Sequence, residues 1–158
     1  MLVTRGTGYV AGWIIKTLLE ECIFVHDAVR DPSKKEKLAH LRELESKNTG
    51  KLKFFKADLL LKGSYFEAMQ DCTVVFHTAS PFTSKITNPQ KDLVDPALLG
   101  TRYVLQSVNE TPTVTRVVLT SSAVAMYGDN KDIESAPNHT LTEGQWNTTS
   151  GVEHQPYL

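Results

Sequence analysis

A glycine-rich turn separates the first apolar strand from the helix that follows it, within Val3–Gly12. Gly6, Gly8 and Gly12 lack the side chains that would keep a phosphate away from the backbone or a helix away from a strand. The first turn of such a helix presents N–H groups without partners and the positive end of the helix dipole, which together favour an anion. The pattern predicts a pyrophosphate-binding turn, with an ordinary tight turn as the alternative. Its candidate binding residues are Thr7, Gly8, Tyr9 and Val10.

Arg30 closes the second apolar run, 23–29, at the distance from the glycine turn where nucleotide-binding βαβ units place the residue that contacts the adenosine ribose. An acidic residue there favours NAD, whereas a guanidinium offers a planar cation to a 2′-phosphate. Lys34, Lys35 and Lys37 follow at the start of the next helix. The pattern predicts NADP(H) as the preferred cofactor and leaves NAD(H) possible. A solvated basic helix face after a turn is the alternative.

Polar side chains also follow three later apolar runs, at Asp58, Thr78–Ser80 and Thr120–Ser122. Ligands of wound parallel sheets bind beyond the carboxyl ends of the strands, so these residues are expected near one site. Asp58 has the alternative role of capping the next turn, and Ser122 that of bonding backbone groups at a strand end. His77 is expected to pack inside the protein rather than to act in catalysis.

The elements that position these groups alternate between strand and helix. Near-continuous apolar strands joined by helices predict an α/β fold, with a doubly wound parallel sheet, helices on both faces and right-handed crossovers. The fifth strand is expected to be buried, and the sequence from 129 onward to form polar loops. Strands are predicted at 2–4, 23–29, 53–57, 73–77 and 116–120, and helices from the glycine turn to 21, at 34–46, 64–70 and 91–109.

The composition of the 158 residues excludes several classes of protein. With 17 basic and 18 acidic residues, the net charge of −1 implies no nucleic-acid partner. No apolar run approaches the length of a membrane span and no secretory leader is visible, so a cytoplasmic protein is expected. Cys22 and Cys72 are expected to be reduced and buried, and no metal site is predicted. Tyr127 and Trp146 are expected to pack.

Ordered motifs along the chain resemble those of the extended short-chain dehydrogenase/reductase family, with its NAD-dependent epimerase/dehydratase-type domain. The similar branch holds dihydroflavonol reductases, cinnamoyl-CoA reductases and NADPH-dependent aldehyde reductases. The resemblance implies one Rossmann-type NAD(P)-binding domain over 1–158, with the C-terminal part of the fold and the substrate lobe missing from these residues. The motifs are at 7–12, 28–32, 57–59, 75–82, 95–97, 100–101, 116–123 and 155–157.

The resemblance also implies roles for individual residues. Asp58 and Leu59 would hold the adenine, the turn at 78–80 would line the cofactor, and Arg30 and Lys37 would meet the 2′-phosphate. The implied cofactor-binding set is Thr7, Gly8, Tyr9, Val10, Arg30, Lys37, Asp58, Leu59, Thr78, Ala79, Ser80, Thr120 and Ser121.

The chemistry that the resemblance implies is hydride transfer from a nicotinamide to the carbonyl of a small-molecule substrate. Ser122 matches the serine that holds the carbonyl oxygen, and Tyr157 matches the tyrosine that supplies a proton. The alternative for Tyr157, near the end of these residues, is a frayed and inert side chain. A phenol with an ordinary pKa near ~10 needs a nearby positive charge to exchange protons at neutral pH. The family's lysine lies four residues after the tyrosine, a position beyond Leu158. The oligomeric state is not indicated.

Three residues depart from the family's pattern. Arg5 stands where the family has the first glycine of its glycine-rich motif, and its side chain would either crowd a pyrophosphate or neutralise its charge. Cys22 stands where a glycine usually ends the first helix. Asp27 places a carboxyl inside the second strand, where burial without a partner costs several kcal/mol. The leading hypothesis is an NADPH-dependent carbonyl reductase. The alternatives are a truncated, non-catalytic nucleotide-binding remnant and a sugar-nucleotide epimerase or dehydratase, against which Arg30 argues because such epimerases usually prefer NAD.

Overall fold

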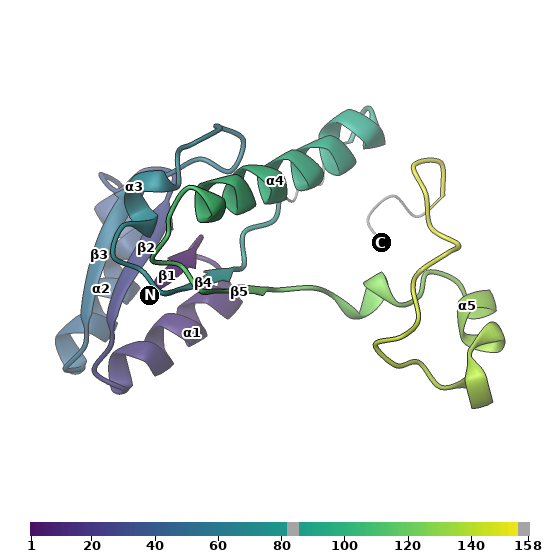
Figure 1. Ribbon diagram of the computed structural model, residues 1–158, viewed down its shortest axis with the longest axis horizontal. Coiled ribbons are helices and arrows are strands. Elements are labelled where there is room, and N and C mark those ends of the chain that lie inside the picture. Colours follow the sequence, from purple (N-terminus) through teal and green to yellow (C-terminus); the bar gives the residue numbers. More distant parts are fainter. Residues whose placement is uncertain (82–85, 155–158) are drawn as a thin grey trace. The chain divides into compact units, whose positions relative to one another are not determined.

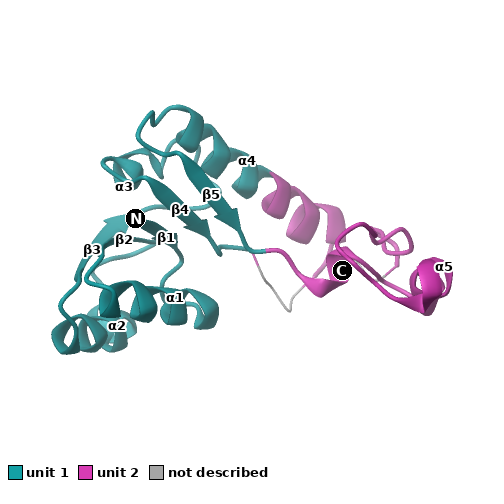
Figure 2. Cartoon of the chain, turned by 60° about the horizontal axis from the view of Figure 1, so that its bottom comes forward, with its two compact units in different colours: residues 1–80, 99–120 teal, residues 81–98, 121–158 magenta. Residues whose placement is uncertain are grey.

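A computed structural model describes residues 1–81 and 86–154 (Figure 1). The chain forms two compact units (Figure 2). Unit 1 consists of residues 1–80 and 99–120, and unit 2 of residues 81–98 and 121–158.

Unit 1 contains a five-stranded parallel sheet in the order β3-β2-β1-β4-β5. β1 lies at its centre, where Val3 is in register with Asp27 on one side and Phe76 on the other. The strand order therefore reverses between β1 and β4, and ligands bind at such a reversal in wound sheets. The strands are β1 (Leu2–Thr4), β2 (Phe24–Val29), β3 (Lys51–Lys56), β4 (Val74–His77) and β5 (Arg116–Leu119).

Helices cover both faces of this sheet, as Figure 1 shows. α1 (Tyr9–Glu20) and α2 (Lys35–Lys47) pack on one face, and α3 (Phe66–Met69) and α4 (Asp95–Asn109) lie on the other. Neighbouring residues of a strand point to opposite faces, so Val3 belongs to the core under α1 and α2 whereas Leu2 belongs to the core under α3 and α4. The predicted Rossmann-type fold is confirmed.

The helices of the second face differ from the sequence-based expectation at their ends. α3 is shorter than the predicted 64–70, because the backbone leaves the helical region at Gln70, with ψ of 135°. A π-helical turn at Gln90–Val94 directly precedes α4. At Gly100 an added Cβ would lie 2.4 Å from Cγ of Leu59, so glycine allows this helix to approach the loop after β3.

Two expectations about burial in unit 1 were wrong. β5 was expected to be buried, yet Val118 is 41% and Leu119 53% exposed, because β5 is an edge strand with β4 on one side only. Cys22 is exposed, because it lies in the turn that ends α1. Cys72 is buried as predicted, and neither thiol forms a disulfide.

Unit 2 contains short elements joined by turns. After residue 120 these are two 3₁₀ turns (Ala123–Ala125 and Pro137–His139) and α5 (Asn130–Ser135), so the polar region after 129 is not all loop. Trp146 was expected to pack, but it is 75% exposed. Over residues 1–81 and 86–154, no helix has both the length and the apolar character needed to span a bilayer, and no cluster of potential metal ligands is present.

Candidate functional site

The carboxyl ends of the strands gather most of the predicted site residues at one edge of unit 1. This follows from the parallel arrangement, because strands that run in one direction all end at the same edge. The residues that follow the strand ends there are Thr7–Val10, Arg30, Asp58–Leu59, Thr78–Ser80 and Thr120.

The glycine turn after β1 leads directly into α1. Gly8 is the N-cap, and no side chain caps this helix end. The N–H of Gly8 donates to the carbonyl of Arg5 at 2.8 Å, whereas the N–H groups of Tyr9 and Val10 lie in the first turn, where a helix offers no acceptor. Tyr9 is 83% and Val10 50% exposed. An added Cβ on Gly8 would lie 3.2 Å from the carbonyl of Arg5, which is a tight contact.

Arg5 occupies the left-handed backbone region, with φ of 59°. Glycine adopts this conformation at no steric cost, which explains why a glycine would be favoured here. The Arg5 side chain extends to the turn after β4, where Nη1 donates to the carbonyl of Ser80 at 2.6 Å. Arg5 therefore links the turns that follow β1 and β4, on either side of the reversal in strand order.

The Thr4 hydroxyl, at the end of β1, holds the turn after β4 to the centre of the sheet. Its oxygen accepts the N–H groups of Thr78 and Ala79, both at 3.0 Å, and lies 3.1 Å from Nδ1 of His77. Because two donors already use this oxygen, its proton is directed to Nδ1, which leaves the neutral ring protonated at Nε2. Burial lowers the pKa of His77. His77 is a packed strand residue, as predicted.

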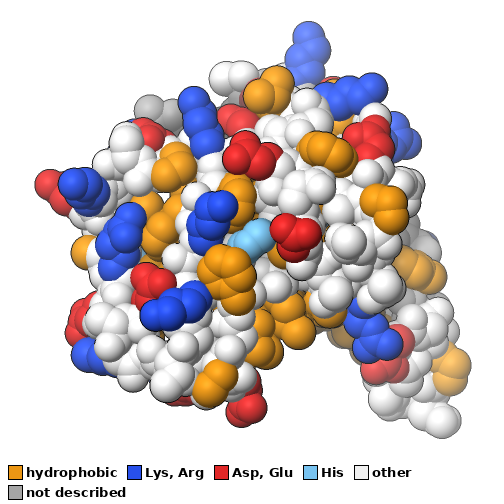
Figure 3. Space-filling view, turned by 60° about the vertical axis from the view of Figure 1, so that its left-hand side comes forward, with side chains coloured by type: hydrophobic (Ala, Val, Ile, Leu, Met, Phe, Trp, Pro, Cys, Tyr) orange, Lys and Arg blue, Asp and Glu red, His pale blue; other side chains and the backbone are white. Residues whose placement is uncertain are grey.

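A group of exposed cations follows β2. Arg30, Lys34, Lys35 and Lys37 are all exposed. Lys34 lies 3.7 Å from Asp31, whose carboxylate also accepts the Ser33 N–H and hydroxyl, so the predicted turn at 31–33 exists. The other three cations form no ion pair within the described chain. In a space-filling view from the side of β3 and α2, basic side chains are interspersed with acidic and apolar ones rather than forming a continuous stripe (Figure 3).

Asp58 combines an exposed position with a local structural role. Its Oδ1 accepts the N–H of Leu60 at 2.9 Å, and the Ser64 hydroxyl donates to its carbonyl at 2.6 Å. The turn-capping alternative is therefore present in the structure. Asp58 is also exposed at the edge that bears the glycine turn, which is compatible with contact to an adenine. That contact stays a prediction. Leu59 is half-buried against α4.

Asp27 lies in the middle of β2 and is completely buried. Its Oδ1 accepts the N–H of Gly6 at 2.8 Å, and its Oδ2 has no hydrogen-bond partner in the described chain. Burial raises the pKa of Asp27 to about 7, although the bond from Gly6 acts in the opposite direction. The sequence indicated an unfavourable buried carboxyl, but it did not indicate this contact with the glycine turn.

Ser121 and Ser122 belong to unit 2. Ser121 and Ser122 are exposed, and Ser122 Oγ accepts the N–H of Val124 at 3.4 Å, as an N-cap of the turn at Ala123–Ala125. This bond uses a lone pair of Oγ and leaves the hydroxyl proton available for donation. Tyr157 lies outside the described residues.

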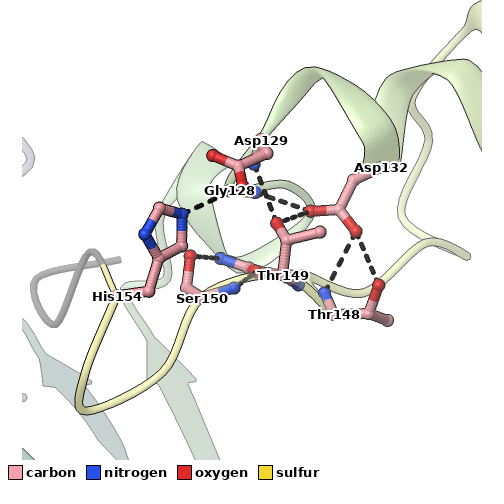
Figure 4. Close-up of polar contacts among 8 residues, drawn as sticks. Gly128, Asp129, Asp132, Thr148, Thr149, Ser150 and His154 are labelled. Atoms are coloured by element: carbon pink, nitrogen blue, oxygen red, sulfur yellow. Dashed lines mark hydrogen bonds and ion pairs between the residues drawn. The ribbon is translucent and has the colours of Figure 1, made fainter.

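A hydrogen-bond cluster around Asp132 organises unit 2 (Figure 4). The Asp132 carboxylate accepts bonds from the N–H of Gly128, from the N–H and hydroxyl of Thr148, and from the Thr149 hydroxyl. These bonds lower the pKa of Asp132 well below its usual range, the Thr148 hydroxyl contributing most. His154 pairs with Asp129 at 2.9 Å. Sequence reasoning did not find this cluster, because bonded partners such as Asp132 and Thr149 are 17 residues apart and follow no periodic pattern.

Thr4 and Asp132 are the two organising residues that sequence reasoning missed. Thr4 could have been found as a hydroxyl at the very end of the central strand, next to the glycine turn. Such a side chain is positioned to bond the turn after the neighbouring parallel strand.

A family model described as the NAD dependent epimerase/dehydratase family matches residues 1–151. The chain belongs to this family. Its curated relatives include several plant reductases, which confirms the resemblance to the reductase branch. Cinnamoyl-CoA reductase CAD2 of Medicago truncatula is 43% identical over 129 residues, covering 82% of this chain and 39% of that protein. Dihydroflavonol 4-reductase of Gerbera hybrida is 36% identical over 144 residues, covering 91% of this chain and 38% of that protein.

Solved structures support the same assignment. The crystal structure of Gre2 from Candida albicans, in complex with NADPH, matches with a TM-score of 0.78 and 31% sequence identity. The match covers 94% of this chain and 44% of that one. The chain therefore spans less than half the length of these relatives.

Proposed function

We propose that residues 1–158 form the NAD(P)-binding domain of an oxidoreductase that uses NADPH to reduce an aldehyde or a ketone to an alcohol. The observation that carries the proposal is the occurrence, at one sheet edge, of helix N–H groups without acceptors in the helix and of cations that form no ion pair in the described chain. Tyr9 and Val10 present the N–H groups, and Arg30 and Lys37 present the cations. A dinucleotide with a 2′-phosphate carries negative charge at both places.

The residues present fit such a cofactor. Gly8 has no side chain between the backbone of the turn and a ligand, and an added Cβ would lie 3.2 Å from the carbonyl of Arg5. A helix N-terminus with free N–H groups suits a pyrophosphate, and a guanidinium suits a phosphate because it donates two parallel hydrogen bonds. The Gre2 structure contains NADPH, which supports the same choice for this chain.

The reductase chemistry assigns a role to each predicted catalytic residue. When bound, reduced nicotinamide supplies a hydride to the carbonyl carbon of the substrate. Ser122 donates its hydroxyl proton in a hydrogen bond to the carbonyl oxygen, which its capping bond with Val124 permits. Tyr157 transfers its phenolic proton to that oxygen, and the product is an alcohol.

Calorimetric titration tests the cofactor assignment. We expect Arg30→Ala to raise the Kd for NADPH about tenfold and to change the Kd for NADH less than about twofold, because only NADPH carries the 2′-phosphate. Lys47→Ala is the matched control, since it removes an exposed cation from the opposite end of α2. Equal losses of affinity for both cofactors, or no binding of either by folded protein, would contradict the assignment.

Oxidation of NADPH in the presence of a panel of aldehydes and ketones tests the reaction, in a chain extended past Leu158 so that it includes the family's lysine and the substrate lobe. Turnover that falls at least about a hundredfold in Ser122→Ala, with the Kd for NADPH unchanged, is the expected result. Binding of NADPH without turnover of any carbonyl would leave a nucleotide-binding protein and overturn the reductase assignment.

A further inference from the structure

A carboxyl group lies directly against the glycine turn. Asp27 is 0% exposed, and its Oδ1 accepts the N–H of Gly6 at 2.8 Å. A Cβ placed on Gly6 would lie 2.1 Å from Oδ2 and 2.4 Å from Oδ1 of Asp27, so the backbone of the turn and the carboxyl are in contact. The residue is therefore packed against the segment that we propose binds the pyrophosphate.

This carboxyl has no cation to balance it. Oδ2 of Asp27 has no hydrogen-bond partner in the described part of the chain, and no ion pair there includes the residue. A buried carboxylate without a partner is strongly unfavourable, whereas a neutral carboxyl is tolerated. The local structure therefore suits the protonated form of Asp27.

The titratable groups of the neighbouring elements do not change the preference of Asp27 for its protonated form. β1 contributes none, and the three lysines of β3 are exposed. Tyr65, before α3, interacts with Asp27 electrostatically, but burial raises its pKa to about 12 and it stays neutral. On β2 itself, His26 bonds to the carbonyl of Ala68 under α3, and burial lowers its pKa. Arg5, beside the turn, donates to Ser80.

The helices on the face of the sheet that Asp27 shares with Val25 and Val29 are α1 and α2. On α1 the titratable residues are Tyr9, Lys16 and Glu20, of which Lys16 and Glu20 pair with each other. On α2 they are exposed except for the half-buried Glu45, and none of those in the described chain pairs with Asp27.

We propose that Asp27 is a proton-dependent positioning residue for the dinucleotide-binding turn: its neutral form admits the anionic cofactor, and its carboxylate form repels it. The inference rests on the proposed function, because it requires a phosphate group at the turn. Repulsion between two negative charges is large where water is excluded and both groups are held in place. The proton on Asp27 thus becomes a condition for tight binding.

The direction of the pH dependence follows from linkage. In the folded chain without cofactor, the pKa of Asp27 is about 7. A bound anion next to the carboxyl raises this pKa further. Binding above pH 7 must therefore take up a proton, so affinity declines as pH rises through this range and is constant below it. The 2′-phosphate of NADPH acts in the opposite direction, because it gains negative charge near pH ~6 and then binds cations better.

Asp27→Asn is the decisive variant, because asparagine keeps an oxygen that accepts the Gly6 N–H but has no titrating proton. Between pH 6 and pH 8.5, the Kd for NADPH changes by some factor in each protein. We expect this factor to be about ten times larger for the wild-type chain than for Asp27→Asn. Comparison of the two proteins cancels the titration of the ligand and of His26 and His77, which both proteins share. Glu20→Gln is the control for loss of a carboxylate elsewhere in unit 1.

The outcomes separate the two proposals. Binding with the same pH dependence in wild type and Asp27→Asn would overturn the role of Asp27 and leave the proposed function intact. Absence of NADPH binding by both folded proteins at every pH would overturn both. Should Asp27→Asn not fold, titration of the wild type in two buffers of different ionisation enthalpy gives the answer. We expect uptake of about half a proton or more on NADPH binding at pH 7.5, and zero uptake would overturn the inference.

Discussion

Arg5 and Cys22 both hold the left-handed backbone conformation, at φ of 59° and 60°. For residues other than glycine this conformation costs roughly 1–2 kcal/mol. Cys22 lies at the end of α1, where its N–H bonds to the carbonyl of Leu19 and the next N–H bonds to that of Leu18. This is the hydrogen-bond pattern that usually ends with a glycine. The two departures from the family's pattern thus fall at positions where the backbone favours glycine.

Cys22→Gly is expected to raise the free energy of unfolding by about 1 kcal/mol, because it removes the strain of the left-handed conformation. The lost contact between Sγ and the Thr49 hydroxyl, 2.8 Å apart, is exposed and contributes little. Urea denaturation measures the change. Cys22→Ala is the control, since it removes the thiol and keeps the Cβ. An equal gain in both variants would show that the thiol, not the backbone, is responsible.

Asp27 also affects stability through pH. Its pKa of about 7 in the folded chain exceeds the ordinary value of 3.8, so between these values the folded chain keeps a proton that the unfolded chain has released. Stability therefore falls as pH rises from about 4 to 7, at about 1.4 kcal/mol per pH unit and by about 4 kcal/mol in all.

We expect Asp27→Asn to remove this decline, so that the variant exceeds the wild type in stability at pH 8 by a few kcal/mol. Denaturant unfolding at several pH values measures the difference between the two proteins. The buried neutral rings of His26 and His77 destabilise both proteins alike below about pH 6.5 and cancel in this comparison. Parallel curves for the two proteins would contradict the assigned pKa.

At the scale of elements, β5 differs from the other strands. Among the described strands it pairs only with β4, and the exposed side chains of Val118 and Leu119 lie beside the other edge of its backbone. Exposed, apolar edge strands are sites of association between chains. The 158-residue chain is therefore expected to associate through this strand.

Leu119→Lys should lower the concentration-dependent light scattering of the chain, because a charge on an edge strand opposes pairing with another copy. Leu60→Lys is the matched control, since Leu60 is also 53% exposed but lies in the loop after β3. Equal effects of the two changes would point to surface charge in general rather than to the edge of β5.

The parallel sheet and its helices could be predicted from the sequence, because apolar runs of strand length alternate with helical patterns and the glycine turn marks the first crossover. The gathering of Arg30, Asp58 and Thr78 at one edge followed from that topology. Contacts between distant side chains had no such signal. The bonds of Thr4 to the turn after β4 span more than 70 residues, and the contact of Asp27 with Gly6 depends on the register of β1 and β2. The exposure of β5 was missed because an apolar run is the same in a central and an edge strand.

At the scale of the whole molecule, the two units depend on different interactions. Unit 1 has two apolar cores around a sheet, whereas unit 2 relies on the hydrogen bonds of Asp132. The lowered pKa of Asp132 means that this stabilisation is present above the ordinary carboxyl pKa near 4 and is lost as pH falls toward the lowered value.

We expect Asp132→Asn to accelerate amide hydrogen exchange in residues 128–150 and to leave exchange in β1, β2 and β4 unchanged. Exchange measured by mass spectrometry locates the effect. Glu134→Gln is the control on the same helix, because Glu134 is exposed and forms none of the bonds of the cluster. Faster exchange in the strands as well would show that the two units unfold together.

The placement of β1 at the centre of the sheet also has a consequence for synthesis of the protein. β1 is made before either of its neighbours, and its pairing with β4 needs residues up to Phe76. Until those residues leave the ribosome, Leu2 and Val3 lack one of the two strands that pair with β1. Exposed apolar segments of nascent chains are the ones that chaperones bind. Slower translation between β2 and β4 would lengthen this exposed stage.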